Sequence, residues 1–108
     1  MAASISREQI YAALSDETRA VTVRLDEQNI AGDAYPLAVT GDVLAASTAV
    51  DALVLDGDFW VSADGLFQPA YANWHYDGQA PPESIDLARQ TLGEPWVSED
   101  WYVSFVWR

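Results

Sequence analysis

The chain has 108 residues, half of them hydrophobic and 12% aromatic, which suits one domain with its own core and excludes a disordered acidic tail. Its net charge of −12 arises from seventeen acidic residues against five arginines and no lysine, a balance that argues against direct binding to nucleic acid or an anionic membrane. The absence of cysteine excludes disulfides, thiolate catalysis and cysteine-ligated zinc. We therefore expect a single compact domain over residues 1–108 of a cytoplasmic protein, without a secretory signal.

The amino-terminal third is predicted to form a helix followed by strands. Ser6-Arg7-Glu8-Gln9 has the pattern of a capping box, which predicts a helix from Ser6 to about Ser15. Apolar and polar residues then alternate over residues 19–26, which predicts a half-buried strand. Pro36 confines any strand at residues 35–40 to the edge of a sheet.

The middle of the chain is predicted to contain a short helix and a hairpin. For residues 42–49 we favour a helix that begins at Asp42. Asp56-Gly57-Asp58 separates two apolar runs, so it predicts a β-hairpin with its tight turn at the glycine. Asp64-Gly65 predicts a second turn of the same kind.

The last third is predicted to contain two strands around a helix. Residues 71–76 alternate as a strand, and Pro81 to Leu92 has helical spacing. The final strand, residues 101–107, places four large apolar side chains on one face: Trp101, Val103, Phe105 and Trp107. This order of elements predicts an α+β domain, mainly an antiparallel sheet of about five to six strands with two to three helices packed on one face.

The acidic residues are concentrated away from the amino terminus. Between Arg24 and Arg89 the chain has eleven carboxylates and neither arginine nor lysine. The acids are interspersed with apolar residues, which is typical of a folded surface rather than an acidic tail. Self-repulsion of this kind destabilises a compact fold. The chain therefore either uses this negative field in binding or is adapted to concentrated salt.

No catalytic or metal-binding motif is present. His75 is the only histidine, and no nucleophile motif such as G-x-S-x-G accompanies it. Asp56-Gly57-Asp58 resembles the start of a calcium loop, but the later ligand positions hold Trp60 and Phe67. Adjacent carboxylates such as Glu99-Asp100 occur by chance in so acidic a chain. We predict no catalytic residue, no metal site and no cofactor.

Aromatic residues offer a second kind of candidate. Five tryptophans and five tyrosines exceed what a core of this size needs. For Trp60 and Trp74 we favour a place in the core. If exposed, they and Tyr76 would be anchors in an acidic field, an arrangement that gives protein interfaces both affinity and orientation.

The sequence favours a non-enzymatic acidic binding or inhibitor protein. Its partner would be a protein with a basic surface, such as a nucleic-acid-binding complex or nuclease. The chain would occupy that surface as a nucleic-acid mimic of the anti-CRISPR, anti-restriction or immunity-protein type. One alternative is a cytoplasmic protein or accessory subunit of a salt-adapted microbe. Another is a small sugar-binding module or hydrolase centred on Trp74 and His75. The predicted partner-binding residues are Asp51, Asp56, Asp58, Asp64, Trp60, Trp74 and Tyr76.

Overall fold

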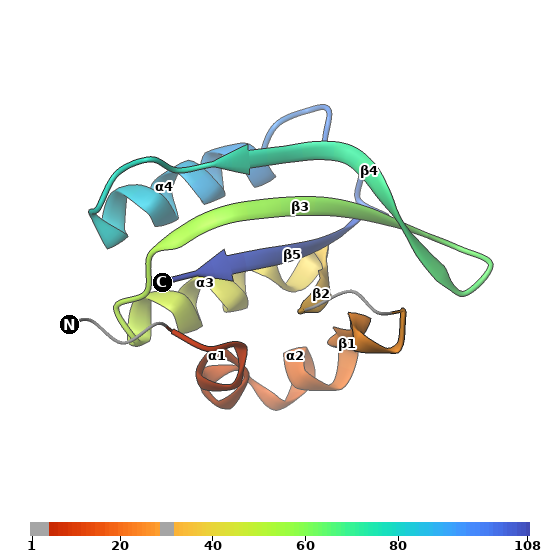
Figure 1. Cartoon of the computed structure of the whole chain (residues 1–108), viewed down its shortest axis with the longest axis horizontal. Helices are drawn as coiled ribbons and strands as arrows, with labels where there is room; N and C mark the ends of the chain where they lie inside the picture. Colours follow the sequence, from red (N-terminus) through yellow and green to blue (C-terminus); the bar gives the residue numbers. More distant parts are fainter. Residues whose placement is uncertain (1–4, 29–31) are drawn as a thin grey trace.

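A five-stranded antiparallel sheet organises the fold, in the strand order β1-β2-β5-β3-β4 (Figure 1). The computed structural model describes residues 5–28 and 32–108. In chain order the elements are α1 (Arg7–Ala13), α2 (Asp16–Val21), β1 (Val23–Arg24), the 3-10 turn η1 (Leu25–Gln28), β2 (Asp33–Pro36), the 3-10 turn η2 (Leu37–Val39), α3 (Thr40–Ala49), β3 (Val54–Ala63), β4 (Leu66–His75), α4 (Pro81–Leu92) and β5 (Tyr102–Trp107).

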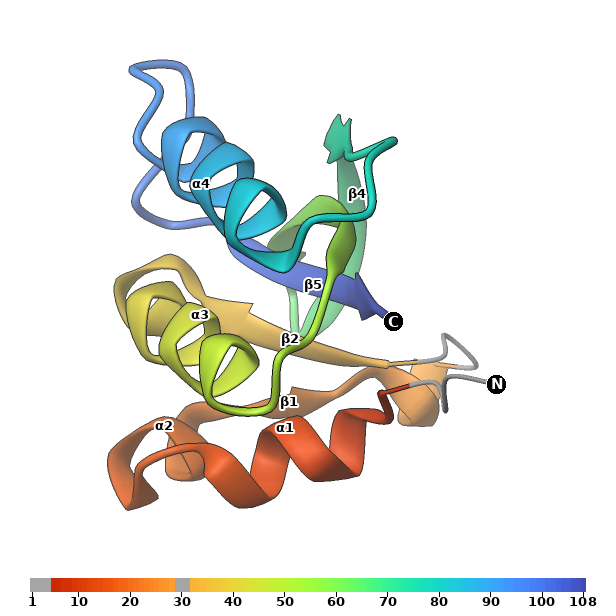
Figure 2. The same ribbon diagram turned by 90° about the vertical axis from the view of Figure 1, so that its left-hand side faces the viewer.

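The helices leave one side of the sheet uncovered. Figures 1 and 2 show α3 and α4 on the same side of β3, β4 and β5, and α1 packs on α3. Within the described residues no helix lies over the opposite side, which we call the outer face. The outer face consists of the alternate residues that point away from the helices: Asp56, Asp58, Trp60, Asn73, His75, Tyr102, Ser104 and Val106. The predicted α+β class, with an antiparallel sheet and packed helices, is confirmed.

The core lies between the sheet and the helices, and β5 runs through its centre. Val103 and Phe105 of β5 are buried, whereas Val106, which points to the outer face, is 49% exposed. The Phe105 ring contacts the rings of Tyr35, Trp74 and Trp107. The prediction that one face of residues 101–107 belongs to the core is therefore confirmed.

The amino-terminal prediction is right for the first helix and wrong for much of the segment after it. The capping box is present. The Ser6 hydroxyl accepts a hydrogen bond from the Gln9 backbone N–H, and the Gln9 side-chain oxygen accepts one from the Ser6 backbone N–H. Residues 19–26, predicted as one strand, instead contain the end of α2, the short β1 and the start of η1. Ser15 caps α2 by accepting a hydrogen bond from the Thr18 backbone, and this local signal outweighs the apolar alternation.

The region predicted as an edge strand lies inside the sheet. β2 pairs with β1 on one side and β5 on the other, and the chain enters the turn η2 directly after Pro36. Proline is tolerated here because it is the last residue of its strand. The helix predicted at residues 42–49 is confirmed, although it starts at Thr40, and so is the helix from Pro81 to Leu92.

The hairpin predicted around Gly57 is wrong, because β3 continues through it. The turn lies at the second candidate, Asp64-Gly65, where both residues have positive φ angles, of 53° and 79°. Gly57 serves a different purpose: a Cβ atom there would overlap the ring carbons of Trp74. The glycine therefore permits the close approach of an aromatic ring rather than a reversal of the chain.

The pairing of β3 with β4 is interrupted by a bulge. Asp58 pairs with Asn73, and the next pair along the strands is Trp60 with Pro69. Three β4 residues, 70–72, therefore oppose the single residue Phe59. Tyr71, at the middle of the bulge, has a φ angle of 57° and is 95% exposed. The bulge thus turns an aromatic side chain away from the core and into solvent.

Candidate functional site

The outer face is built from three rows of side chains that cross the strands. From the end of β4 towards the hairpin the rows are His75–Asp56–Val106, Asn73–Asp58–Ser104 and Pro69–Trp60–Tyr102. Side chains opposite one another on neighbouring strands lie about 5 Å apart, so members of a row are in contact range. The acids occupy one end of the face and the aromatic residues the other.

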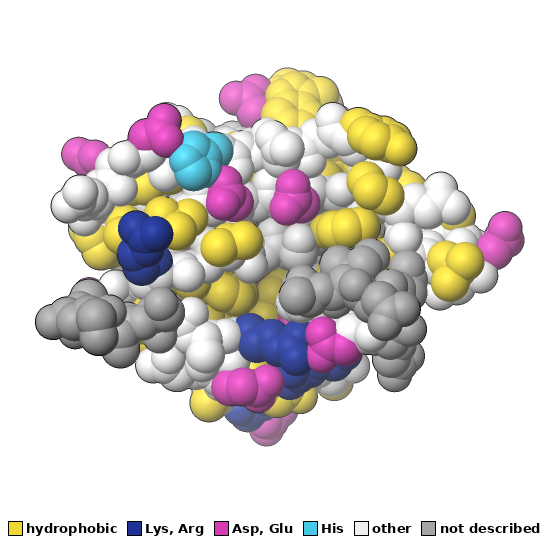
Figure 3. All heavy atoms as spheres, in the orientation of Figure 1, with side chains coloured by type: hydrophobic (Ala, Val, Ile, Leu, Met, Phe, Trp, Pro, Cys, Tyr) yellow, Lys and Arg dark blue, Asp and Glu magenta, His cyan; other side chains and the backbone are white. Residues whose placement is uncertain are grey.

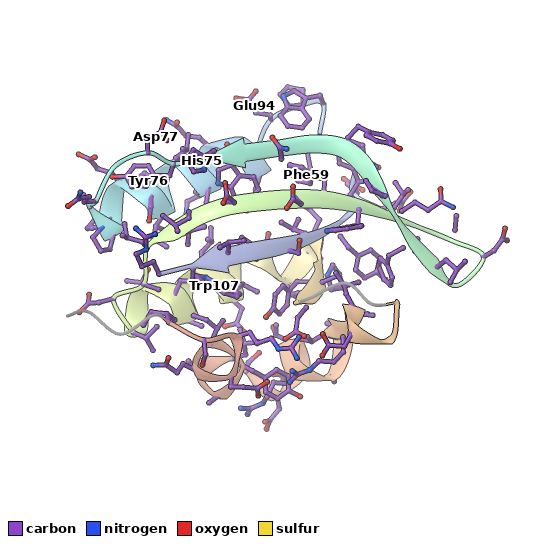
Figure 4. The ribbon with its side chains drawn as sticks, viewed as in Figure 1. Phe59, His75, Tyr76, Asp77, Glu94 and Trp107 are labelled. Atoms are coloured by element: carbon purple, nitrogen blue, oxygen red, sulfur yellow. The ribbon has the colours of Figure 1, made fainter. Side chains whose placement is uncertain are left out.

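His75 is held between two carboxylates at the end of β4. Its Nδ1 faces Oδ1 of Asp56, and its Nε2 lies 2.7 Å from Oδ1 of Asp77. Figure 4 shows His75 and Asp77 close together at the carboxyl end of the strand. The hydrogen bond to Asp56, together with the negative charge of Asp77, raises the pKa of His75 above its usual value. The imidazole is therefore more readily protonated than an ordinary histidine side chain.

Asp58 is the partly buried acid of the outer face. Burial and the neighbouring charge of Asp56 raise the pKa of Asp58, against the effect of a hydrogen bond from Asn73. In the described part of the chain no arginine forms an ion pair with Asp56 or Asp58. Asp56 has the His75 imidazole as its partner, whereas Asp58 has no cationic partner among the described residues.

The arginines of the amino-terminal layer are already paired with acids. Arg7 binds Asp26, Arg24 binds Glu8 at 2.8 Å, and both reach the buried Asp33 at 3.4 Å. Burial raises the pKa of Asp33, and the two guanidinium groups oppose that rise. Figure 3 shows basic side chains gathered with acidic ones in the lower part of the view, and a further basic side chain on the same face as the histidine and its neighbouring acids. Acids outside the amino-terminal layer lie both on the outer face, at Asp56 and Asp58, and away from it, at Asp51 on the helix side and at Glu94, Glu99 and Asp100 before β5.

The structure brings only some of the predicted partner-binding residues together. Asp56, Asp58 and Trp60 share the outer face, with Trp60 half-buried and its Nε1 donating to Oγ of Ser104 at 2.8 Å. Asp64 lies at the hairpin tip, roughly 26 Å of extended chain from Asp56.

Three predicted residues do not belong to this surface. Asp51 lines a hollow of about 280 Å³ between the ends of α3 and α4, on the helix side, together with Asp86 and Arg89. Trp74 is only 7% exposed and packs on Phe59 and Phe105 in the core, so the exposure that a partner-binding role required is absent. Tyr76 is 9% exposed, and its hydroxyl group donates to Glu83 and accepts from the Ala80 backbone, so it stabilises the loop before α4.

Sequence reasoning missed the bulge and the hollow beside it. A hollow of about 280 Å³ lies at the bulge and is lined by Asp58, Phe59, Trp60, Pro69, Tyr71, Ala72 and Asn73. The signal that could have located it is Pro69, since proline within a strand marks an edge or a bulge. Asp77 was also missed, because its proximity to His75 depends on how the chain leaves β4.

Neither a metal centre nor a membrane span is found in the described residues. No group of three His, Asp or Glu side chains among residues 5–28 and 32–108 is placed to hold a metal ion. No helix in the same residues is long and apolar enough to cross a membrane. Comparison with known proteins gives no match to a protein family, to a curated protein or to a solved structure. The outer face is therefore interpreted from its own chemistry.

Proposed function

We propose that this chain is a non-enzymatic cytoplasmic binding protein whose outer face occupies a basic surface on another protein. The observation that carries the proposal is the pair Asp56 and Asp58, which lie on a strand inside the sheet without an arginine partner in the described residues. A strand hydrogen-bonded on both sides presents its charges in a fixed arrangement, so little ordering is required when a partner binds.

The spacing of these acids supports nucleic-acid mimicry. Alternate residues on one face of a strand are about 6.6 Å apart, comparable with neighbouring phosphates of a nucleic-acid strand. Basic protein surfaces are commonly built to hold that phosphate chain. An acidic fold of this size competes for such a surface in the manner of anti-CRISPR, anti-restriction and nuclease-immunity proteins. The partner is therefore a nucleic-acid-binding complex or nuclease.

The geometry of His75 favours binding over catalysis. A histidine that activates a serine needs one ring nitrogen beside the hydroxyl group and the other beside an acid. Here both ring nitrogens face carboxylates, those of Asp56 and Asp77. The sugar-binding alternative loses Trp74 and Tyr76 as stacking residues, because both are buried. Adaptation to salt is the remaining alternative, and it predicts that folding itself depends on molar salt.

The proposal is tested by removing charge from the β3–β4 hairpin. A triple variant, Asp56→Asn with Asp58→Asn and Asp64→Asn, keeps side chains of similar size. Its matched control loses the same charge from the exposed segment before β5, through Glu94→Gln, Glu99→Gln and Asp100→Asn. Basic proteins captured from a cell lysate at low salt are identified and purified, and their binding to each form is measured with and without duplex DNA as a competitor.

We expect the triple variant to bind at least about tenfold more weakly, which corresponds to about 1.4 kcal/mol shared among three residues. The control should change binding much less, and duplex DNA should displace the wild-type chain. Association should slow steeply with added salt while dissociation changes little, because the acids act by electrostatic steering. Equal binding by the two variants, or a captured partner that duplex DNA does not displace, contradicts the proposal.

A further inference from the structure

The bulge between β3 and β4 opens a small hollow at the boundary between the acidic and aromatic ends of the outer face. Its volume of about 280 Å³ is below the range of about 300–1,000 Å³ typical of pockets for whole small molecules. It is therefore of a size for a single side chain presented by another protein. Asp58 and Asn73 lie on one side of the break, and Trp60 and Pro69 on the other.

The hollow contains a carboxylate whose charge is not matched from within the protein. Asp58 is partly buried, and its hydrogen bond from Asn73 is a neutral one. Partial burial of a charged group is unfavourable unless a cation or several donors compensate it. The same burial raises the pKa of Asp58, because it disfavours the charged carboxylate. A cation entering the hollow would supply this compensation.

The hollow between the ends of α3 and α4 differs in this respect. Asp51 and Asp86 line it together with Arg89, and an Arg89 nitrogen lies 3.9 Å from Oδ1 of Asp86. That hollow already contains its own guanidinium group. Of these two hollows, the one at the bulge combines an acid that has no cationic partner in the described residues with three aromatic residues, Phe59, Trp60 and Tyr71.

The lining favours a guanidinium group over an ammonium group. A guanidinium is planar, donates in a fork that matches a carboxylate, and stacks on aromatic faces. The hollow offers the carboxylate of Asp58 and the amide oxygen of Asn73 as acceptors, and Trp60 and Tyr71 as aromatic neighbours. Tyr71 is 95% exposed and is held in the left-handed region, so its ring is available to an incoming group.

We propose that the hollow at the β3–β4 bulge receives the side chain of an arginine on the partner's basic surface. This inference rests on the proposed function and names the group that the outer face recognises. Asp58 binds the guanidinium, Asn73 accepts a further hydrogen bond, and Tyr71 and Trp60 stack on it. The more exposed acids, Asp56 and Asp64, then contribute charge without forming the pocket.

The test uses small probes and needs no protein partner. N-acetyl-arginine methylamide is titrated into the 15N-labelled chain at low salt, beside the matching citrulline and lysine amides. Citrulline has the shape of arginine without its charge. The signals followed are the indole N–H of Trp60 and the side-chain amide of Asn73. We expect saturable shifts at these signals with the arginine amide, and much weaker binding of the lysine and citrulline amides.

Two variants locate the site. Asp58→Asn should weaken binding of the arginine amide by about tenfold, which is the effect of losing one charge-assisted hydrogen bond. Asp64→Asn, which removes the same charge at the hairpin tip, should change binding by about twofold or less. A further variant, Tyr71→Asn, introduces a residue that tolerates the left-handed conformation and should weaken binding by removing the ring.

Several outcomes would overturn the inference. They are shifts spread over the acidic surface, equal effects of Asp58→Asn and Asp64→Asn, equal binding of the lysine or citrulline amide, and no saturation by the arginine amide. The probe comparison on the wild-type chain decides the question even if a variant fails to fold. If the chain binds the arginine amide but the triple variant binds the protein partner as tightly as the wild type, the proposed function alone is contradicted. If the triple variant loses partner binding but the chain does not bind the arginine amide, this inference alone is contradicted.

Discussion

At the scale of single residues, the contact between Gly57 and the Trp74 ring is the tightest constraint that the structure reveals. A methyl group added at Gly57 would overlap three carbons of that ring. We predict that Gly57→Ala lowers the free energy of unfolding by about 3 kcal/mol, the upper part of the usual range for overpacking. Urea unfolding followed by circular dichroism measures this effect.

Gly41 provides the matched control for that substitution. It lies in α3, and a Cβ atom there would meet nothing within 4 Å. Gly41→Ala should therefore stabilise the protein by about 0.5–1 kcal/mol through helix propensity. Equal effects of the two substitutions would show that the Trp74 ring moves aside without loss of packing.

His75 gives a residue-scale prediction on pH dependence. Its pKa is raised in the folded state, first by the hydrogen bond to Asp56 and then by Asp77. The protonated form therefore contributes stability that is fully present below the unfolded pKa of about 6.5 and is lost as the pH rises through the higher folded value. Because the side chain is exposed, the effect should be small and is best measured on the residue itself.

The measurement is an NMR titration of the single histidine ring. We predict a pKa above the usual value in the wild-type chain and a lower one in Asp77→Asn, because that substitution removes a carboxylate near Nε2. Asp64→Asn, remote along the hairpin, should leave the titration almost unchanged. An identical pKa in all three proteins would show that the His75–Asp77 contact does not persist in solution.

At the scale of secondary-structure elements, β5 joins the two parts of the sheet. It pairs with β2 on one side and β3 on the other, and its Phe105 touches three aromatic rings. We predict that Phe105→Ala destabilises the protein by about 3–5 kcal/mol, a large part of the roughly 5–15 kcal/mol typical of a small domain. Val106→Thr on the outer face should change stability by about 0.5 kcal/mol or less. Similar melting temperatures for both variants would contradict this placement of the core.

The elements also show what the sequence could and could not predict. The caps and turns that depend on adjacent residues were predicted well, as at Ser6 and at Asp64-Gly65. Asp56-Gly57-Asp58 has the same local pattern as a turn, but the glycine is needed for a contact with a residue seventeen positions away in sequence. Local pattern cannot separate these two uses of glycine. The candidate hollow was missed for the same reason, because it depends on the register between two strands.

At the scale of the whole molecule, the distribution of charge separates the fold into a balanced and an unbalanced part. Arg7, Arg19 and Arg24 all pair with acids in the amino-terminal layer. Residues 51–108 have ten acids and only two arginines. The edge strand β4 is also protected from pairing with other chains, because it contains Pro69 and the bulge. The unbalanced surface is therefore suited to electrostatic docking rather than to strand addition.

The last prediction concerns salt, and it separates electrostatic docking from adaptation to concentrated salt. With a net charge of −12, the folded chain repels itself, and the Debye length shortens from about 30 Å at about 0.01 M salt to about 3 Å at about 1 M. If the acids serve binding, the core should keep the protein fully folded at low salt. Its urea midpoint should then rise moderately with sodium chloride as the repulsion is screened.

The triple Asn variant of Asp56, Asp58 and Asp64 tests whether the β3–β4 hairpin contributes to that repulsion. Its stability at low salt should equal or slightly exceed that of the wild-type chain, and its urea midpoint should rise less steeply with salt, because three negative charges are gone. Urea is the suitable denaturant, since guanidinium chloride is itself a salt. If the wild-type chain is unfolded at low salt and folds only near molar salt, the acids serve adaptation to salt. The proposed role in docking would then lose its main support.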